Sequence, residues 1–280
     1  MSIIIADSGS TKTQWNILNS NGDIEELFSI GINPYFINKE DIEKTILRLI
    51  DVSKRESVRR LYFYGSGCSA KDQCDLVSSA LQTVFPLAKI EVHSDLLAAG
   101  RALFGDSKGV ACILGTGSNV AVYENNIFTE NINSLGYIIG DQASGAYIGK
   151  ELVRAYFQKD MPADIRSKFE EYSNIKLSEV LDKVYKRKFP NRYLAGFTPF
   201  ASQYIDNEFI NSLISDAIDK FINLQLGSLS FDKSYYKVGF VGSVAYYFKD
   251  ILIKALNNND YQVGKIIKAP MEGLLDYHAD

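Results

Sequence analysis

Hydrophobic and polar positions alternate with the period of a β-strand at the start of the chain. An apolar run covers residues 3–6, and residues 13–17 alternate between strand-forming and polar side chains. The cluster at residues 19–23 contains an Asn-Gly pair, a signal for a hairpin turn, and an apolar segment follows at residues 24–30. The pattern predicts that the chain opens with an antiparallel meander of three strands.

Helical and strand patterns then alternate up to about residue 104. Ile42, Ile46, Leu49 and Ile50 recur with helical spacing and predict an amphipathic helix. The elements expected after it are a strand at 61–64, a helix at about 72–85, a strand at 90–92 and a helix at about 95–104. The first hundred residues are therefore predicted to be β-β-β-α-β-α-β-α.

The opening arrangement of strand, small-residue turn and strand occurs a second time. Residues 110–114 form an apolar run, Gly115-Thr116-Gly117-Ser118 is a turn, and residues 120–123 are strand-like, with a third strand beginning at Ile127. Repeats are best sought before a fold is assigned, and two copies indicate a duplicated domain rather than a solenoid. We therefore expect an α/β protein made of two related domains.

The remainder of the chain is predominantly helical in pattern. Residues from about 147 to 226 favour helices, a strand is expected at 237–241, and a helix follows Gly242-Ser243. The tail at 270–278 is predicted to be a short helix that returns to the first domain. The expected domains are 1–107, joined by the tail from about 268 to 280, and 108–267 with a helical insertion.

Composition narrows the class of protein. The 280 residues include 30 Lys and Arg against 34 Asp and Glu, a formal net charge of −4, which argues against a dedicated nucleic-acid binder. Three cysteines cannot form a disulfide framework, and with two histidines the HExxH and three-histidine zinc sites are excluded. The first residues do not resemble a signal peptide, and no apolar run is long enough to span a membrane. We expect a soluble cytoplasmic protein, and the sequence leaves a homodimer open.

The two small-residue turns are the first candidates for chemistry. Gly9-Ser10-Thr11 and Gly115-Thr116-Gly117-Ser118 lack bulky side chains, so backbone N–H groups can approach an anion and hydroxyls add donors. Each turn alone is ordinary turn chemistry, but the matched pair favours a polyphosphate held between two domains. Neither a GxxxxGK[ST] loop nor a GxGxxG after a strand is present, so the P-loop and Rossmann interpretations fail.

Two aspartates follow predicted strands. Asp7, placed inside the first turn, either holds Mg²⁺ through water near the phosphates or forms an Asx-type turn. Asp95 begins a predicted helix, where Ser94 or Asp95 is expected to be the N-cap. It also stands at the carboxyl end of a strand, where sites of α/β proteins usually lie, so a general base is the alternative.

Three further positions have both a structural and a functional interpretation. Residues 136–145 form a glycine-rich loop in which Asp141 is a candidate acceptor for sugar hydroxyls. Gly242-Ser243 either seats a nucleoside or caps a helix through Ser243. Asn33 lies at a turn exit, where Pro34 favours extended backbone.

These motifs together resemble the actin-like ATPase superfamily of sugar kinases, Hsp70 and actin. The resemblance rests on residues 7–13 for the first phosphate motif, 115–119 for the second, and 239–243 for the adenosine motif. Within the superfamily, the chain resembles the N-acetylglucosamine kinase branch, which sits with the BadF/BadG/BcrA/BcrD ATPase family. That closer likeness rests on residues 94–99, 135–145 and 31–33, which match the base-bearing helix, the sugar-binding loop and a sugar-contacting asparagine. The motifs follow the family order over nearly the whole chain.

The resemblance implies two ribonuclease H-like domains with a cleft between them, and ATP-dependent phosphorylation of an N-acetylated amino sugar at the 6-hydroxyl. It implies Asp95 as the base. Asp7, acting on Mg²⁺ through water, would join the nucleotide-binding set of Gly9, Ser10, Thr11, Gly115, Thr116, Gly117, Gly242 and Ser243. Lys12 either assists there or is a solvated strand residue. The sugar would be fixed by Asn33, Ser118, Asn119 and Asp141.

Four positions depart from the family pattern. Ser8 and Ser10 stand where the first motif usually has glycines, and Gln142 and Ala143 stand where the sugar loop usually has Glu and Gly. These departures leave open which amino sugar is used. Two other functions remain as alternatives: an ATPase that activates a 2-hydroxyacyl-CoA dehydratase, which would carry an iron–sulfur cluster on cysteines such as Cys68 and Cys112, and a non-enzymatic sugar or nucleotide sensor.

Overall fold

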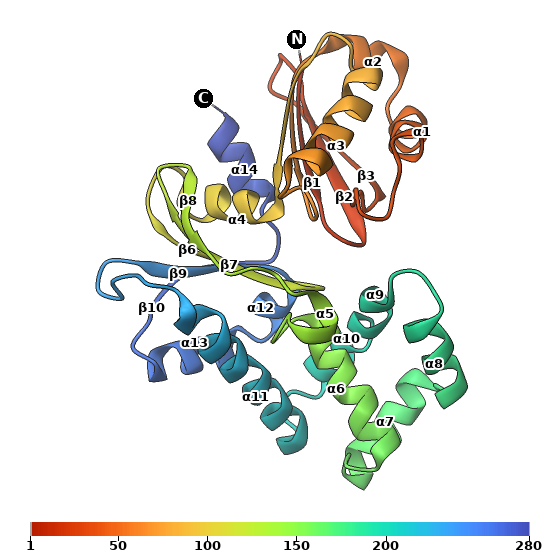
Figure 1. Cartoon of the computed structure of the whole chain (residues 1–280), viewed down its shortest axis with the longest axis vertical. Helices are drawn as coiled ribbons and strands as arrows, with labels where there is room; N and C mark the ends of the chain where they lie inside the picture. The colour runs from red at the N-terminus through yellow and green to blue at the C-terminus, as the bar shows by residue number, and fades with distance from the viewer. Residues whose placement is uncertain (1, 280) are drawn as a thin grey trace. The chain divides into compact units, whose positions relative to one another are not determined.

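Two five-stranded sheets with the same strand order form the framework of the chain (Figure 1). The computed structural model describes residues 2–279. They divide into one compact unit that runs up to Gly105 and resumes at Pro270, and a second unit of Asp106–Ala269. The α/β fold with two related halves, as predicted from the repeated strand–turn–strand pattern, is confirmed.

The first unit contains the sheet β3-β2-β1-β4-β5. Strands β1, β2 and β3 are antiparallel, which confirms the predicted meander, and β1, β4 and β5 run parallel. The strands are β1 (Ser2–Ser8), β2 (Lys12–Leu18), β3 (Ile24–Ile30), β4 (Val58–Gly65) and β5 (Lys89–Ser94). The helices are α1 (Lys39–Leu49), α2 (Val52–Ser57), α3 (Lys71–Val84), α4 (Asp95–Phe104) and α14 (Met271–His278).

The second unit repeats this order as β8-β7-β6-β9-β10. Its strands are β6 (Gly109–Leu114), β7 (Ser118–Glu124), β8 (Ile127–Asn131), β9 (Lys237–Val241) and β10 (Gln262–Ile267). Its helices are α5 (Gly136–Ile139), α6 (Gly145–Gln158), α7 (Ala163–Ser173), α8 (Leu177–Tyr185), α9 (Pro190–Ala195), α10 (Thr198–Gln203), α11 (Glu208–Leu224), η1 (Leu226–Ser228), α12 (Ser243–Tyr247) and α13 (Lys249–Asn258).

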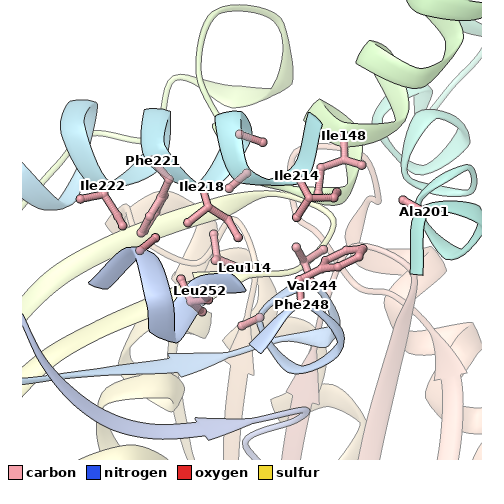
Figure 2. Close-up of a cluster of buried hydrophobic side chains, with 14 of the residues drawn as sticks. Leu114, Ile148, Ala201, Ile214, Ile218, Phe221, Ile222, Val244, Phe248 and Leu252 are labelled. Carbon is pink, nitrogen blue, oxygen red and sulfur yellow. The ribbon is translucent and has the colours of Figure 1, made fainter. Parts of the chain in front are cut away.

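Helix α11 covers one face of the second sheet because its apolar residues recur at helical spacing. Ile214, Ile218 and Phe221 are buried and point toward the sheet and helices α12 and α13. Figure 2 shows these side chains opposite Leu114 and Leu252. Leu114 is the last residue of β6, so this core fixes the strand end at which the turn of residues 115–117 begins.

Three elements were not predicted: α2, β10 and the four-residue helix α5, which lies in the segment of residues 136–145 that was predicted to be a loop. Helix α2 has six residues and buries none of them, so it leaves no apolar period in the sequence. Strand β10 contains Gly264 and Lys265 among its apolar residues, and its side chains are only partly buried. A Cβ at Gly264 would lie 3.1 Å from the carbonyl oxygen of Val238, so the glycine there permits close pairing with β9.

The tail helix α14 packs on α4 and β1 of the first unit, and its last residue, His278, contacts two tyrosines of β4. The imidazole of His278 stacks on Tyr62, with ring centroids 3.8 Å apart, and its Nε2 lies 2.7 Å from the hydroxyl of Tyr64. Arg101 donates to the same hydroxyl at 2.6 Å. Because arginine cannot accept, the Tyr64 hydroxyl donates its proton to a neutral His278. Burial, with the charge of Arg101, lowers the pKa of His278 to about 4.

We expect the docking of α14 to weaken as the pH falls from 6.5 toward about 4. The folded-state pKa of His278 is depressed below its ordinary value of 6.5, so the unfolded or undocked form binds the proton first. Hydrogen exchange of α14 amides, compared at about pH 5 and about pH 7.5, measures the effect. In a His278→Phe variant, which cannot be protonated, exchange corrected for intrinsic rates should not change in this range. Equal pH sensitivity in both proteins would contradict the assignment.

Helices α6 and α9 are in backbone contact at Gly149. A Cβ on Gly149 would overlap the carbonyl group of Leu194. We expect Gly149→Ala to lower the free energy of unfolding by about 2–3 kcal/mol, because overpacking outweighs the higher helix propensity of alanine. Urea unfolding measures this. The control is Gly115→Ala, whose Cβ meets nothing within 4 Å and should leave stability nearly unchanged. A neutral or stabilising Gly149→Ala would show that α9 can move away.

Candidate functional site

The turn after β1 is closed by backbone hydrogen bonds and packs closely on a neighbouring segment. Gly9 N–H donates to the carbonyl of Lys12 at 3.1 Å, and Gly31 N–H donates to that of Thr11 at 3.0 Å. A Cβ at Gly31 would overlap the carbonyl of Gly9 and lie 2.8 Å from Ser10. The segment that follows β3 therefore packs directly against the backbone of the turn. Only a residue without a Cβ at position 31 allows the two backbones to come this close.

Ser8, the first departure from the family pattern, has a structural role. Its hydroxyl accepts from Ile32 N–H at 2.9 Å, donates to the carbonyl of Ile32 at 3.0 Å, and lies 2.7 Å from the hydroxyl of Thr13. The side chain is fully buried. It thus ties β1, β2 and residues 30–32 together and does not enter the space around the turn.

Asp7 and Asp95 stand at the carboxyl ends of strands in one parallel set. Ser8 pairs with Gly65 of β4, and Gly65 pairs with Ser94 of β5, so both carboxylates lie near one edge of the sheet, two strands apart. Asp7 is the penultimate residue of β1, so the prediction that it lies inside the turn is wrong: the strand continues through Ser8 before the turn begins. Burial, and then the charge of Asp95, raise the pKa of Asp7 to about 7, while Lys12 opposes the shift.

The N-cap of α4 is Ser94. Its hydroxyl accepts from Leu97 N–H at 3.2 Å, and the Asp95 carboxylate accepts from Leu96 N–H at 2.9 Å. The cap is therefore provided without Asp95, which occupies the first helical position. The amino end of a helix favours a negative charge at this position.

Asn33 and Lys12 have defined surroundings in the first unit. The side-chain oxygen of Asn33 accepts from Tyr35 N–H at 3.0 Å and faces Gly67, where a Cβ would lie 2.6 Å from it. The exposed Lys12 extends over the ring of Phe28, with Nζ 4.7 Å from the centroid. This position is compatible with both interpretations of Lys12. The side chain is exposed, as expected of a solvated strand residue, and its charge lowers the pKa of Asp7, as expected of a residue near the phosphates.

The turn after β6 is held by the amino end of α6. Gly145 N–H donates to the carbonyl of Gly115 at 2.7 Å, and Ala146 N–H donates to that of Thr116 at 3.1 Å. Within the turn, Gly115 N–H donates to the carbonyl of Gly117 at 3.0 Å. The loop that precedes α6 is thereby fixed to the turn, which the sequence did not predict.

Asp141 lies directly against this second turn. A Cβ at Gly117 would be 3.1 Å from its carboxylate, and Ser118 N–H donates to it. Its backbone is left-handed, with φ +54°, a conformation that Asp tolerates better than most residues. Burial raises the pKa of Asp141, and the bonds from Ser118 and Ser134 oppose the shift. The structure therefore brings together Gly117, Ser118 and Asp141, as required of a shared ligand site.

Two departures in the sugar loop also have structural explanations. Ala143 has φ +58°, the conformation for which the family glycine is suited, and its methyl group is fully buried. Gln142 accepts a hydrogen bond of 2.7 Å from the amide of Gln225, which also donates to the hydroxyl of Ser118 at 3.1 Å. Sequence reasoning missed Gln225, because it lies at the end of α11, 107 residues from Ser118, with no local pattern to mark it.

Gly242 is positioned where a side chain would not fit. Its φ is +132°, and a Cβ would overlap the carbonyl of Leu114 and lie 3.0 Å from Gly115 N. Gly242 is the N-cap of α12, and Ser243, exposed at the first helical position, makes no capping bond. The interpretation of Ser243 as a cap is therefore wrong. Gly242 places the adenosine-like motif beside the second turn.

Asn119 lies on β7 opposite Ile113, with its side-chain oxygen accepting from Val120 N–H at 2.9 Å. The residue as a whole is partly exposed and directly follows the buried Ser118.

Searches for two other kinds of site gave negative results within residues 2–279. No cluster of three or more His, Cys, Asp or Glu side chains has an arrangement suited to a metal ion. Among the same residues, every helix is too short or too polar to cross a membrane.

We compared the chain with protein-family models, curated proteins and solved structures. No protein-family model matches the chain, and no curated protein matches it. A solved structure named "putative N-acetylglucosamine kinase", from Porphyromonas gingivalis, is 35% identical, covers 99% of this chain and 98% of its own, and has a TM-score of 0.92. This identity and coverage show common family membership.

Two more distant structures show the fold alone. A second "putative N-acetylglucosamine kinase", from Chromobacterium violaceum, is 14% identical, covers 99% of this chain and 98% of its own, and has a TM-score of 0.75. A ROK family glucokinase from Streptomyces griseus, solved with glucose and AMPPNP, is 13% identical, covers 100% and 98%, and has a TM-score of 0.57.

Replacing Asp7 with Asn should stabilise the protein without ligands, and more at about pH 8 than at about pH 5. The folded-state pKa is about 7 against an ordinary 3.8, so the cost of the carboxylate grows as the pH rises from 3.8 and levels off above about 7. Thermal unfolding over this range measures the difference. Asp51→Asn is the matched control, because Asp51 is exposed and makes no cap bond. A lower Tm for Asp7→Asn at about pH 8 would contradict the interpretation.

Proposed function

We propose that this chain, which belongs to the N-acetylglucosamine kinase-like branch of the actin-like ATPase superfamily, transfers the γ-phosphate of ATP to the 6-hydroxyl of an N-acetylated amino sugar. The observation that carries the proposal is the position of Asp95. Its carboxylate stands at the carboxyl end of β5 within electrostatic reach of Asp7, and Ser94 provides the helix cap in its place.

Asp95 is proposed as the general base. Phosphoryl transfer depends on in-line positioning and on neutralised charge, so the protein needs one group that accepts the sugar hydroxyl proton and several that hold phosphates. A carboxylate at the first position of a helix suits the first task, because a helix amino end favours negative charge and the bond from Leu96 N–H fixes the orientation of the side chain.

Asp7 is proposed to hold Mg²⁺ through water. Burial, and then the charge of Asp95, raise the pKa of Asp7, and a bound divalent cation would compensate the charge of its carboxylate. Mg²⁺ usually binds one or two carboxylates together with waters and phosphates, which fits a pair of aspartates. When bound, the ion would neutralise charge on the phosphates of ATP.

The two turns are proposed to hold those phosphates through Gly9, Ser10, Thr11 and Lys12 of the first unit and Gly115, Thr116 and Gly117 of the second. Both turns follow the first strand of their sheets, and Gly115 and Gly9 have open space where a Cβ would be, apart from a 3.8 Å neighbour at Gly9. Backbone N–H groups can therefore approach an anion. Gly242 and Ser243 are proposed to contact the nucleoside.

The amino sugar is proposed to bind Asn33, Ser118, Asn119 and Asp141. Support comes from the second unit, where Asp141 is fixed by Ser118 N–H against Gly117 and Gln225 orients the Ser118 hydroxyl. A carboxylate held in this way is pre-organised to accept hydrogen bonds from sugar hydroxyls.

The buried state of two thiols counts against the dehydratase-activator alternative. Cys112 lies in the middle of β6 and is fully buried, and Cys68 is 2% exposed. Burial raises the pKa of both thiols, to about 12 for Cys68, which disfavours the thiolate form that ligates iron.

The proposal predicts sugar-dependent release of ADP that requires Asp95. We expect Asp95→Asn to lower kcat by about 10²–10⁴-fold, the usual range for a general base. A coupled assay with Mg-ATP would compare N-acetylglucosamine, N-acetylmannosamine, N-acetylmuramic acid, glucosamine and glucose. Asparagine keeps the oxygen that accepts from Leu96 N–H, so the fold should be retained.

Ser94→Ala is the matched control for this experiment. It removes the cap bond to Leu97 N–H and should cost about 1 kcal/mol of stability while leaving most of the activity. Near-normal kcat in Asp95→Asn would remove Asp95 from the role of base. ADP release that does not depend on any sugar would reject the sugar kinase assignment and leave an ATPase.

A further inference from the structure

The carboxyl end of α11 places one amide side chain among the residues proposed to bind the amino sugar. Gln225 is the C-cap of α11 and the N-cap of η1. Its N–H donates to the carbonyl of Phe221 at 2.9 Å, and its own carbonyl accepts from Ser228 N–H at 3.2 Å. Phe221 and the neighbouring Ile222 belong to the buried cluster drawn in Figure 2. The backbone of Gln225 is therefore fixed on both sides.

The amide nitrogen of Gln225 has two hydrogen-bond acceptors. Gln225 is 8% exposed, and its Nε2 atom donates to the hydroxyl oxygen of Ser118 at 3.1 Å and to Oε1 of Gln142 at 2.7 Å. An amide NH₂ group has two hydrogens, so these two bonds use both of them. Gln225 thus joins three segments of the second unit: the end of α11, the first residue of β7 and the loop before α6.

The bond from Gln225 determines what the hydroxyl of Ser118 can do. Ser118 is 5% exposed, its oxygen accepts from Gln225, and its hydroxyl proton has no acceptor among residues 2–279. The adjacent Asp141 carboxylate accepts instead from the backbone N–H of Ser118 and from the hydroxyl of Ser134. A nearly buried donor without an acceptor is costly. The Ser118 proton is therefore available to an acceptor that is not part of this chain.

A hydrogen-bond donor and an acceptor stand next to each other at this point. The carboxylate of Asp141 is bonded to the Ser118 backbone, and a Cβ at Gly117 would lie 3.1 Å from it. The Ser118 hydroxyl is the donor, and the Asp141 carboxylate is the acceptor. Because hydrogen bonds fix both groups before a ligand arrives, little entropy is lost on binding. The pair suits a ligand with an acceptor close to a donor, as in the hydroxyls and the acetamido group of an amino sugar.

We propose that Gln225 is a positioning residue of the amino-sugar site: its amide occupies a lone pair of the Ser118 oxygen, so that the Ser118 hydroxyl donates its proton to an oxygen of the sugar. This inference rests on the proposed kinase function. It adds the direction of one hydrogen bond to the sugar and a residue, outside the set that touches the sugar, that fixes this direction. Replacing Gln225 should therefore change the affinity for the sugar and leave the affinity for ATP unchanged.

Gln225→Glu is the decisive variant, because it keeps the size of the side chain and reverses the bond. An ionised carboxylate has no hydrogen to donate, so the Ser118 hydroxyl would turn toward it and its proton would be lost to the sugar. The coupled assay is run on the full-length protein at about pH 8, with whichever of the five sugars named above gives wild type its highest kcat/KM.

We expect the KM for the sugar to rise about tenfold or more in Gln225→Glu, because one hydrogen bond to the sugar is lost. In Gln225→Met the hydroxyl stays free to turn toward the sugar but is no longer held, so a rise of about threefold is expected. The KM for ATP should stay within about twofold of wild type in both. A merely structural role predicts the opposite order, because a carboxylate can still bond to Ser118 and Gln142, whereas methionine cannot.

Two controls separate this role from a loss of stability or a change of charge. Asn207→Ala removes the cap at the other end of α11, where the Asn207 side chain accepts from Ile210 N–H at 3.3 Å, and should leave the sugar KM unchanged. In a Ser118→Ala background, neither Gln225→Glu nor Gln225→Met should raise the sugar KM further, because no hydroxyl remains to be turned. An effect of the new carboxylate on Asp141 would persist in that background.

An unchanged sugar KM in Gln225→Glu would overturn the proposal, because it would mean that Ser118 already donates to the amide oxygen of Gln225. A larger rise in Gln225→Met than in Gln225→Glu, or an equal rise with and without the Ser118 hydroxyl, would overturn it as well. If Gln225→Glu does not fold, the pair of Gln225→Met with Ser118→Ala gives the same decision. Failure of the kinase function is distinguishable, because wild type itself would then release ADP without dependence on any sugar, which rejects both proposals.

Discussion

The second unit depends on two hydrogen bonds at the amino end of α6. Gly145 and Ala146 donate to the carbonyls of Gly115 and Thr116, so the turn, the loop that contains Asp141 and the first residues of α6 form one rigid structure. Helix α9 packs on the same part of α6, and Gly242 packs on Leu114 just before the turn. A helix end that would otherwise present unpaired N–H groups thus uses them to organise a loop.

The fold was predictable where the period of the sequence was strong. The meander, α3, α4, β9 and the repeat of the strand–turn–strand unit follow from alternation and helical spacing, because each element buries one face. Helix α2 and β10 have no such face and could not be found. Turn chemistry identified the glycines near Asp7 and Asp141, but local sequence does not contain the contacts between distant segments, such as Gln225 with Ser118 or Gly31 with Gly9.

The departures from the family pattern show how local chemistry can change while the backbone is kept. The side chain of Ser8 points into the interior. Its hydroxyl therefore adds hydrogen bonds to the backbone of Ile32 without occupying space at the surface of the turn. Ala143 instead keeps a left-handed conformation that costs about 1 kcal/mol for a residue with a Cβ. The surrounding bonds at Ser144 and Gly145 hold the loop in that conformation despite the cost.

The first unit is discontinuous, since α14 packs on α4 and β1 although residues 106–269 lie between them in the chain. During synthesis on a ribosome, the first sheet would emerge long before the helix that covers Tyr62 and Tyr64. At 5–20 residues per second, the delay is roughly ten to thirty seconds. For that time the aromatic face stays open to solvent and to chaperones, and the second unit can complete its own core before the first is closed.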